Sequence, residues 1–125
     1  MRVAFTSSDG RTIDEHFGTA RDFWIWEVGP GTATAVGKVS ALAMSGDEED
    51  RIAARAGAIA DCAIVWTVQI GGPAAAKLVA RRIHPMKCAA EVPIAEVVAK
   101  LQRVLEGNPP PWLRKAMNAG GPAER

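Results

Sequence analysis

Apolar residues along the chain fall into short runs and periodic stretches, and this alternation predicts strands and helices in turn. Short runs rich in apolar and β-branched residues, bounded by glycine, proline or small polar residues, predict strands. Stretches whose apolar residues recur every three or four positions predict helices. The expected strands span 2–6, 21–28, 32–42, 61–68 and 83–89, and the expected helices span 45–60, 70–82 and 92–107.

The order of these elements predicts an α/β fold. The turn at Gly29–Gly31 joins two adjacent strands, which favours an antiparallel hairpin. Residues 61–68 are almost continuously apolar and lie between two helical stretches, which is typical of a buried parallel strand. We therefore expect a mostly parallel central sheet with an antiparallel hairpin. Right-handed crossover connections would place helices on both faces of this sheet.

Residues at the ends of the helical stretches define the expected domain. Ser45 or Asp47 can cap the first helix, and Gly107 follows the last one. Beyond Gly107 the chain is rich in proline, and its pattern predicts a partly disordered tail. We expect one α/β domain at residues 1–107 and a proline-rich C-terminal tail at 108–125.

Composition and charge narrow the possible partners. The formal net charge is +1, from 15 basic and 14 acidic residues, and no charge run is long enough to bind nucleic acid. No apolar stretch approaches the roughly 20 residues that span a bilayer. Two cysteines do not suggest a disulfide framework. We expect a cytoplasmic protein with reduced thiols and with neither a nucleic acid nor a membrane as its partner.

Three loops are expected to meet at one edge of the sheet. In open α/β sheets, ligands bind beyond the carboxyl ends of the strands. This rule selects the turn Ser7–Gly10, the loop after Val68, and the end of the strand that contains Cys88. The segment IDEHFG, with His16, follows closely on the first of these loops. The candidate ligand-binding residues therefore come from this edge.

Gly71 and Gly72 form a candidate anion-binding turn. Glycine lets the backbone approach a ligand closely, and the helix that starts near Pro73 offers free N–H groups and the positive end of its dipole. The turn lacks the Lys-Ser/Thr pair of a P-loop and the spacing of a dinucleotide fingerprint. The alternative is a tight strand-to-helix turn that binds nothing.

His16 is the candidate metal ligand of the IDEHFG segment. Its imidazole can offer a nitrogen to a metal, and Asp14 or Glu15 can orient the ring. A single histidine cannot form a closed mononuclear site, which needs about four protein ligands. A preassembled cluster that carries its own sulfides needs only one or two. The alternative is that His16 is a hydrogen-bonding loop residue.

The other candidate groups are cysteines, a second histidine and carboxylates. Cys88 can supply a thiolate to a metal at the ligand edge, or it can pack in the core. Cys62 and His84 are expected to be structural. Four carboxylates could form the magnesium site of a nuclease, but they crowd one turn or lie at the opposite edge of the sheet, so enzymatic chemistry has little support. The carboxylates concerned are Asp9, Asp14, Glu15 and Asp61.

Several segments in combination resemble a known family. They are VAFTSSDG, IDEHFGTARDFWIWEV, DCAIVWTVQIGGPAAAKLVARRIHPMK, and PIAEVVAKLQ followed by GNPPPWLRKAM, and they cover most of the chain. The chain resembles the NifX/NafY family, the dinitrogenase iron–molybdenum cofactor biosynthesis domain. The resemblance implies a ribonuclease H-like α/β fold without nuclease activity. It also implies that His16 takes part in cluster binding, because it aligns with the histidine of the family's D-[EQ]-H-F-G motif.

The resemblance implies a carrier that binds an iron–sulfur precursor of the iron–molybdenum cofactor. Such a carrier passes its cargo between nitrogenase cofactor assembly proteins, namely the cluster-synthesising enzyme and the assembly scaffold. An anionic cluster would gain from the amides of Gly71 and Gly72, from the hydroxyls of Ser7 and Ser8, and from the charge of Arg11 or Arg21.

A second expected function is a protein-interaction module that regulates cofactor assembly without being the main carrier. Its basis is the tail segment NPPPWLRKAM, in which Trp112 can anchor a partner. The alternative for Trp112 is that it packs back on its own domain.

Overall fold

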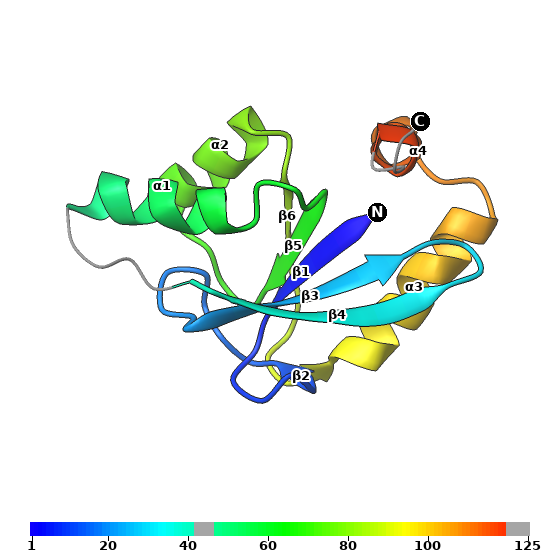
Figure 1. Ribbon diagram of the computed structural model, residues 1–125, viewed down its shortest axis with the longest axis horizontal. Coiled ribbons are helices and arrows are strands. Elements are labelled where there is room, and N and C mark those ends of the chain that lie inside the picture. The colour runs from blue at the N-terminus through cyan, green and yellow to red at the C-terminus, as the bar shows by residue number, and fades with distance from the viewer. Residues whose placement is uncertain (42–46, 120–125) are drawn as a thin grey trace.

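The computed structural model describes residues 1–41 and 47–119, and its centre is a five-stranded sheet (Figure 1). The strands lie in the order β4-β3-β1-β5-β6. Their bounds are β1 Arg2–Thr6, β3 Asp22–Val28, β4 Ala33–Ser40, β5 Ile64–Thr67 and β6 His84–Lys87. All five strands predicted from the sequence are therefore present.

The register of the sheet confirms both the parallel part and the hairpin. β1 is central and runs parallel to β5, with Val3 opposite Ile64, and β5 runs parallel to β6. On its other side β1 pairs antiparallel with β3, which in turn pairs antiparallel with β4. The carboxyl ends of β1, β5 and β6 consequently lie at one edge of the sheet.

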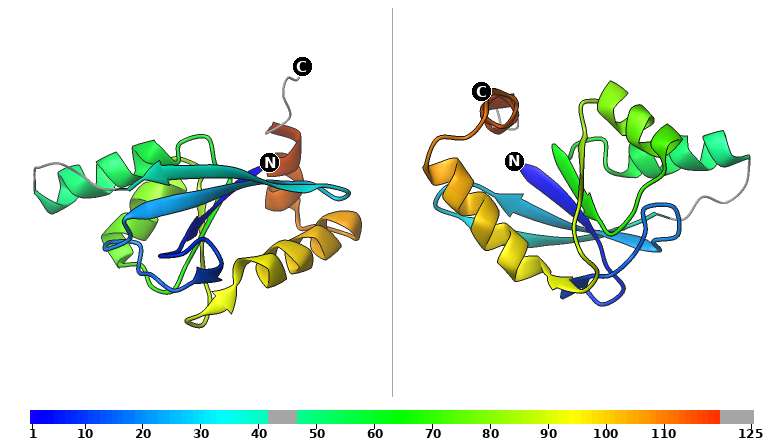
Figure 2. Two further views of the ribbon diagram at one scale, coloured as in Figure 1. Left: turned by 60° about the horizontal axis from the view of Figure 1, so that its bottom comes forward. Right: turned by 180° about the vertical axis from the view of Figure 1, so that it is seen from behind.

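Helices cover both faces of the sheet, as predicted (Figure 2). The helices α1 Glu48–Ala58 and α2 Gly72–Ala80 lie on one face, and α3 Ile94–Glu106 lies on the other. Each face has its own apolar cluster. The cluster under α1 and α2 includes Phe17, Phe23, Ile59, Val65 and Leu78, and the cluster under α3 includes Phe5, Ile13, Ile64, Val98 and Leu101.

Local signals in the sequence account for the helix starts. Asp47 caps α1, accepting a hydrogen bond from the Asp50 amide at 2.9 Å, and the Asp50 carboxylate accepts one from the Asp47 amide in return. The other candidate cap, Ser45, lies outside the described residues. Pro73 lies in the first turn of α2, where its missing N–H costs nothing. None of the helices within residues 1–41 and 47–119 could cross a membrane.

Three elements of the structure were not predicted. Thr12–Ile13 (β2) and Val92–Pro93 (β7) pair in a small antiparallel sheet. Pro111–Ala119 forms a helix, α4, where the sequence predicted an irregular proline-rich tail. The proline run ends at the first helical position, and proline is well tolerated there. Leu113 of α4 is only 3% exposed and belongs to the apolar cluster under α3, so this part of the tail packs on the domain.

The turn after β1 depends on a glycine at position 10. Gly10 has a φ of +79°, and a Cβ atom at this position would lie 2.7 Å from the Trp24 ring. The Trp24 indole N–H donates a hydrogen bond of 2.9 Å to the Ser7 carbonyl oxygen, which holds the ring against the turn. The turn therefore has neither the backbone freedom nor the space for a side chain.

Gly10→Ala should lower the free energy of unfolding by about 3 kcal/mol, because a left-handed backbone and an overpacked contact act together. Chemical denaturation followed by circular dichroism measures this change. The matched control is Gly31→Ala, since Gly31 has no positive φ and no atom within 4 Å of an added Cβ. We expect the control to stay within about 0.5 kcal/mol of the wild type. Equal stability of the two variants would contradict this account of the turn.

Candidate functional site

The Glu15 carbonyl oxygen joins the two central strands to the loop that carries His16. It accepts hydrogen bonds from Thr6 Oγ1 at 2.8 Å, Thr67 Oγ1 at 3.0 Å and the Val68 amide at 3.1 Å. Thr6 ends β1 and Thr67 ends β5, and both side chains are buried. The loop is therefore fixed directly across the carboxyl ends of these strands.

His16 lies on a backbone that continues the sheet. It forms a parallel bridge with Gln69, and the Phe17 amide donates to the Gln69 carbonyl oxygen at 2.8 Å. The His16 carbonyl oxygen accepts from the Ala20 amide at 3.0 Å, which closes a tight turn. The His16 side chain is exposed and has no hydrogen bond or ion pair among the described residues. A fixed backbone thus presents an imidazole whose nitrogens are not used by the described protein groups.

Arg55 of α1 holds the other end of the same loop. Its Nη1 donates to the Phe17 carbonyl oxygen at 3.0 Å and to the Ala20 carbonyl oxygen at 2.7 Å. Arg55 is only 7% exposed, and this burial lowers its pKa, whereas the nearby Glu15 carboxylate raises it. A buried cation is thereby matched to two backbone oxygens that would otherwise be unpaired.

A cavity of about 250 Å³ lies between this loop, α1 and the start of α2. No side chain caps the first turn of α2 among the described residues, so its N–H groups and positive dipole end are available there. A Cβ on Gly72 would meet nothing within 4 Å, and one on Gly71 would meet only the Pro73 ring at 4.0 Å. The cavity is lined by Phe17, Gly18, Glu48, Arg51, Ile52, Arg55, Gly71, Pro73 and Ala74.

The structure thus brings the His16 loop and the Gly71 turn together. Phe17 and Gly18 follow His16 directly and share the cavity lining with Gly71. The open space beside Gly71 and Gly72 also shows that packing within the described protein does not require glycine at either position. Glycine would be required at these positions if a ligand approaches the backbone closely.

Charges of both signs surround the site. Arg51 and Arg55 line the cavity together with Glu48. Burial and the neighbouring charge of Asp14 raise the pKa of the Glu15 carboxyl, while a hydrogen bond from the Arg21 backbone amide and the positive charge of Arg21 lower it. Glu15 Oε1 is buried and has no hydrogen-bond partner among the described residues. Arg21 itself is exposed beside the loop.

The two candidate serines make hydrogen bonds within the turn. Ser7 is buried; its hydroxyl donates to Asp9 Oδ1 at 3.1 Å and accepts from the Gly10 amide at 2.8 Å. Ser8 is exposed, and its hydroxyl donates to Asp14 Oδ2 at 2.5 Å. The proton of each hydroxyl is thus directed to a carboxylate, so neither serine points a free donor at a ligand in this arrangement.

The acidic residues of the turn hold the backbone. Asp9 Oδ1 accepts from the Arg11 amide at 2.8 Å and from the Thr12 amide at 3.1 Å, and these bonds lower the pKa of the Asp9 carboxyl. Asp14 Oδ1 accepts from the Ser8 amide at 2.9 Å. Both carboxylates are engaged in fixing the loop.

Neither cysteine lines the cavity beside the His16 loop. Cys88 is partly buried against the apolar cluster under α3, and burial raises the pKa of its thiol. Cys62 is buried, as predicted, and the pKa of its thiol is raised to about 12, mainly by burial. No three His, Cys, Asp or Glu side chains within residues 1–41 and 47–119 form a group that could hold a metal ion.

Sequence reasoning missed three residues that build the site. Thr6, Thr67 and Arg55 were not singled out, although together they fix the loop around His16. A usable signal exists for Arg55, which lies three positions after Ile52 and beside Ala56 on the apolar face of its helix. A basic residue on such a face needs a buried partner. The two threonines end strands and carry no comparable signal.

The fold and the site define an α/β domain with a candidate ligand-binding edge, where an exposed histidine lies near an uncapped helix start. Comparison with known proteins agrees with this class. The model of the dinitrogenase iron–molybdenum cofactor family matches residues 1–104. The chain is 43% identical over 123 residues to NifX of Herbaspirillum seropedicae, covering 96% of this chain and 84% of NifX.

Two further likenesses extend this comparison. The chain is 40% identical over 119 residues to NifY of Azotobacter vinelandii, covering 95% of this chain but only 49% of NifY, so it spans about half of that relative. The crystal structure of PH0822 has a TM-score of 0.61 at 23% identity, with 82% of this chain and 91% of that chain covered. This last likeness concerns the fold alone.

The chain belongs to the NifX/NafY family of dinitrogenase iron–molybdenum cofactor proteins. This membership gives it a part in iron–molybdenum cofactor biosynthesis and nitrogenase maturation. The names NifX and NifY are those of accessory proteins of this process.

Arg55→Met should lower the free energy of unfolding by about 3 kcal/mol, because it removes two charge-assisted hydrogen bonds and leaves the Phe17 and Ala20 carbonyl oxygens buried without a donor. Amide hydrogen exchange should also accelerate at Thr19 and Ala20, whose N–H groups bond within the loop. Arg103→Met, at an exposed position of α3, is the control. If exchange in residues 17–20 is the same in both variants, Arg55 does not hold the loop.

Proposed function

We propose that the chain is a non-catalytic carrier that binds an iron–sulfur precursor of the iron–molybdenum cofactor at the His16 loop. It passes this cargo from a cluster-synthesising enzyme to an assembly scaffold. The observation that carries the proposal is the exposed His16 imidazole on a fixed backbone, near the open start of α2. The kind of cargo is inferred from the family, because the family model that matches the chain is that of the dinitrogenase iron–molybdenum cofactor.

The arrangement around His16 suits an anionic cluster. Its imidazole nitrogen is a good ligand for iron, and the loop hydrogen bonds to Gln69 and Ala20 keep its backbone in place. The N–H groups at Gly71 and Gly72 and the dipole of α2 favour negative charge close to the cavity. Arg21 adds positive charge beside the loop.

The same site suits transfer better than permanent storage. His16 offers one protein ligand at the exposed edge, whereas Cys88 lies with the α3 cluster as a thiol whose raised pKa disfavours the thiolate. A cluster held by few protein ligands exchanges more readily than one enclosed by four. The carboxylates of the neighbouring turn are occupied in holding the loop, which favours a binding function over hydrolysis.

The ribonuclease H-like fold is part of this proposal. A five-stranded sheet with a hairpin on one side of β1, parallel strands on the other and helices on both faces supports it. In this assignment the fold serves as a scaffold for binding, with the His16 loop at the ligand edge.

In the second function expected from the sequence, an interaction module, Trp112 of the tail anchors a partner. The Trp112 ring stacks on the His84 ring, with the ring centroids 3.9 Å apart and the planes inclined by 13°. Trp112 thus packs back on its own domain, which was one of the two alternatives for this residue. We retain the carrier as the proposed function.

The test is an anaerobic titration of the protein with the isolated precursor cluster, followed by charge-transfer absorbance. His16→Ala should weaken binding by at least about tenfold, since loss of a ligand exceeds the usual effect of losing a residue that orients one. The control is His84→Ala, which removes the other histidine at the opposite edge of the sheet and should bind as tightly as wild type. Equal affinity of His16→Ala and wild type would refute the ligand role.

A further inference from the structure

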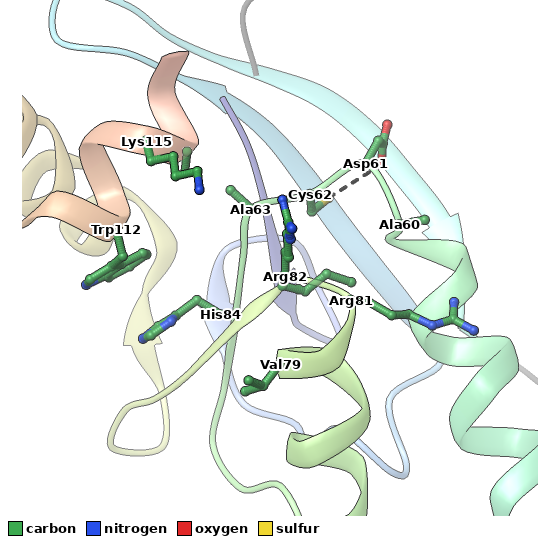
Figure 3. Close-up of a pocket in the computed structure, with 12 residues that line it drawn as sticks. Ala60, Asp61, Cys62, Ala63, Val79, Arg81, Arg82, His84, Trp112 and Lys115 are labelled. Carbon is green, nitrogen blue, oxygen red and sulfur yellow. Dashed lines mark hydrogen bonds between the residues drawn. The ribbon is translucent and has the colours of Figure 1, made fainter. Parts of the chain in front are cut away.

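Figure 3 shows a second and larger cavity, of about 410 Å³. It lies where the chain enters β5 and β6, at the opposite edge of the sheet from His16. It is bounded by α4, by the residues that follow α2, and by the chain that enters β5. Its surface combines small apolar side chains with an aromatic wall and several cations. The lining residues are Ala60, Asp61, Cys62, Ala63, Val79, Arg81, Arg82, Ile83, His84, Trp112, Lys115 and Ala116.

Large apolar side chains are exposed at this cavity. Val79 is 59% exposed, the highest value among the large exposed hydrophobic residues of the described chain, and Trp112 is 39% exposed. Trp112 is nevertheless held in place, because it stacks on His84 and its neighbour Leu113 is buried. A fixed tryptophan and an exposed valine that line one cavity give an apolar surface that a partner can cover at low cost in side-chain entropy.

Two cations from different elements extend toward the same space. Lys115 reaches from α4 and Arg82 reaches from the segment after α2. Figure 3 shows Lys115 directed into the space between Trp112 and Ala63, and Arg82 directed toward Ala63 and Cys62. Neither has an ion pair or hydrogen bond from its side chain among the described residues. The one acidic lining residue, Asp61, is paired with Arg2 at 3.0 Å. The cavity therefore has a net positive charge that the described protein leaves unmatched.

The backbone at Arg82 adds to this observation. Arg82 has a φ of +64°, in the left-handed region where helices usually end on glycine. The Arg82 amide bonds to the Val79 carbonyl oxygen and the Ile83 amide to the Leu78 carbonyl oxygen, each at 2.9 Å, which completes the helix end. Glycine would form this turn with less strain. An arginine at this position brings a cationic side chain to the cavity, although the left-handed backbone is strained for a residue with a side chain.

We propose that this cavity binds an acidic peptide segment of a partner protein, with an apolar side chain of the segment against Trp112 and Val79 and its carboxylates at Arg82 and Lys115. The inference goes beyond cluster binding, because it concerns the opposite edge of the sheet and does not depend on His16. A partner docked there would leave the His16 loop open.

A peptide fits these observations better than a small ligand or a nucleic acid. Sites for small molecules usually enclose most of the ligand surface, whereas Val79 and Trp112 are both exposed at this cavity. A nucleic-acid surface needs an extended basic stripe, and here two cations flank an apolar centre. Tryptophan and arginine around an apolar patch are typical of the energetically important centre of a protein interface.

The test uses the full-length ¹⁵N-labelled chain and a capped hexapeptide in which four acidic residues flank a central Leu-Phe pair. Binding should shift the amide signals of Ala63 and Val79 and the indole N–H signal of Trp112, identified by Trp112→Phe. Two matched peptides are compared: one with glutamine and asparagine in place of the acids, and one with a central Gly-Gly pair. Both should bind at least about threefold more weakly than the acidic Leu-Phe peptide.

Protein variants locate the site. Arg82→Asn, which keeps a residue tolerant of the left-handed backbone, and Lys115→Gln should each weaken acidic-peptide binding by about threefold. Arg103→Gln, at an exposed cation of α3, should leave it unchanged. His16→Ala should also bind the peptide normally, so failure of this proposal is distinguishable from failure of cluster binding.

Two results would overturn the proposal. One is equal binding of the acidic and neutral peptides, or an equal loss in Arg103→Gln. The second result has two parts: heparin produces the same signal shifts, and the Gly-Gly peptide binds as tightly as the Leu-Phe peptide. The cavity would then bind polyanions in general and not an acidic peptide with an apolar centre.

Discussion

The three hydrogen bonds accepted by the Glu15 carbonyl oxygen are the constraint on which the ligand edge depends. Thr6 Oγ1, Thr67 Oγ1 and the Val68 amide all converge on this one atom. They join the ends of two parallel strands to the loop that follows, so the position of His16 is tied to the sheet itself. The buried Arg55 fixes the far end of the loop from α1. An imidazole held on such a fixed backbone needs little reorganisation to bind the cluster.

The sequence predicted much of the fold because local signals and global packing agree. The apolar run in β5, the glycine turn of the hairpin and the Asp47 cap each favour the element that the structure contains. The α4 helix was missed because it begins at the last of three consecutive prolines and its packing depends on a few side chains such as Leu113. Its stability comes from tertiary contacts, which no local pattern records.

The site was predictable only in part, for a similar reason. The proximity of the His16 loop and the Gly71 turn follows from the rule that strand ends meet at one edge. The engagement of Ser7 with Asp9, and the burial of Arg55 against carbonyl groups more than 30 residues away, depend on side-chain contacts in three dimensions. The two edges of the sheet therefore differ: one presents an imidazole on a fixed loop, and the other presents a cationic apolar cavity.

The central claim, that His16 ligates the cargo, is tested most directly by pulsed electron paramagnetic resonance. The chain would carry ¹⁵N-labelled histidine and His84→Gln, which leaves His16 as the only histidine. With a reduced, paramagnetic precursor cluster bound, we predict a hyperfine coupling to one ¹⁵N imidazole nucleus. A bound cluster with no ¹⁵N coupling would contradict the claim, because the protein would then hold its cargo without this imidazole.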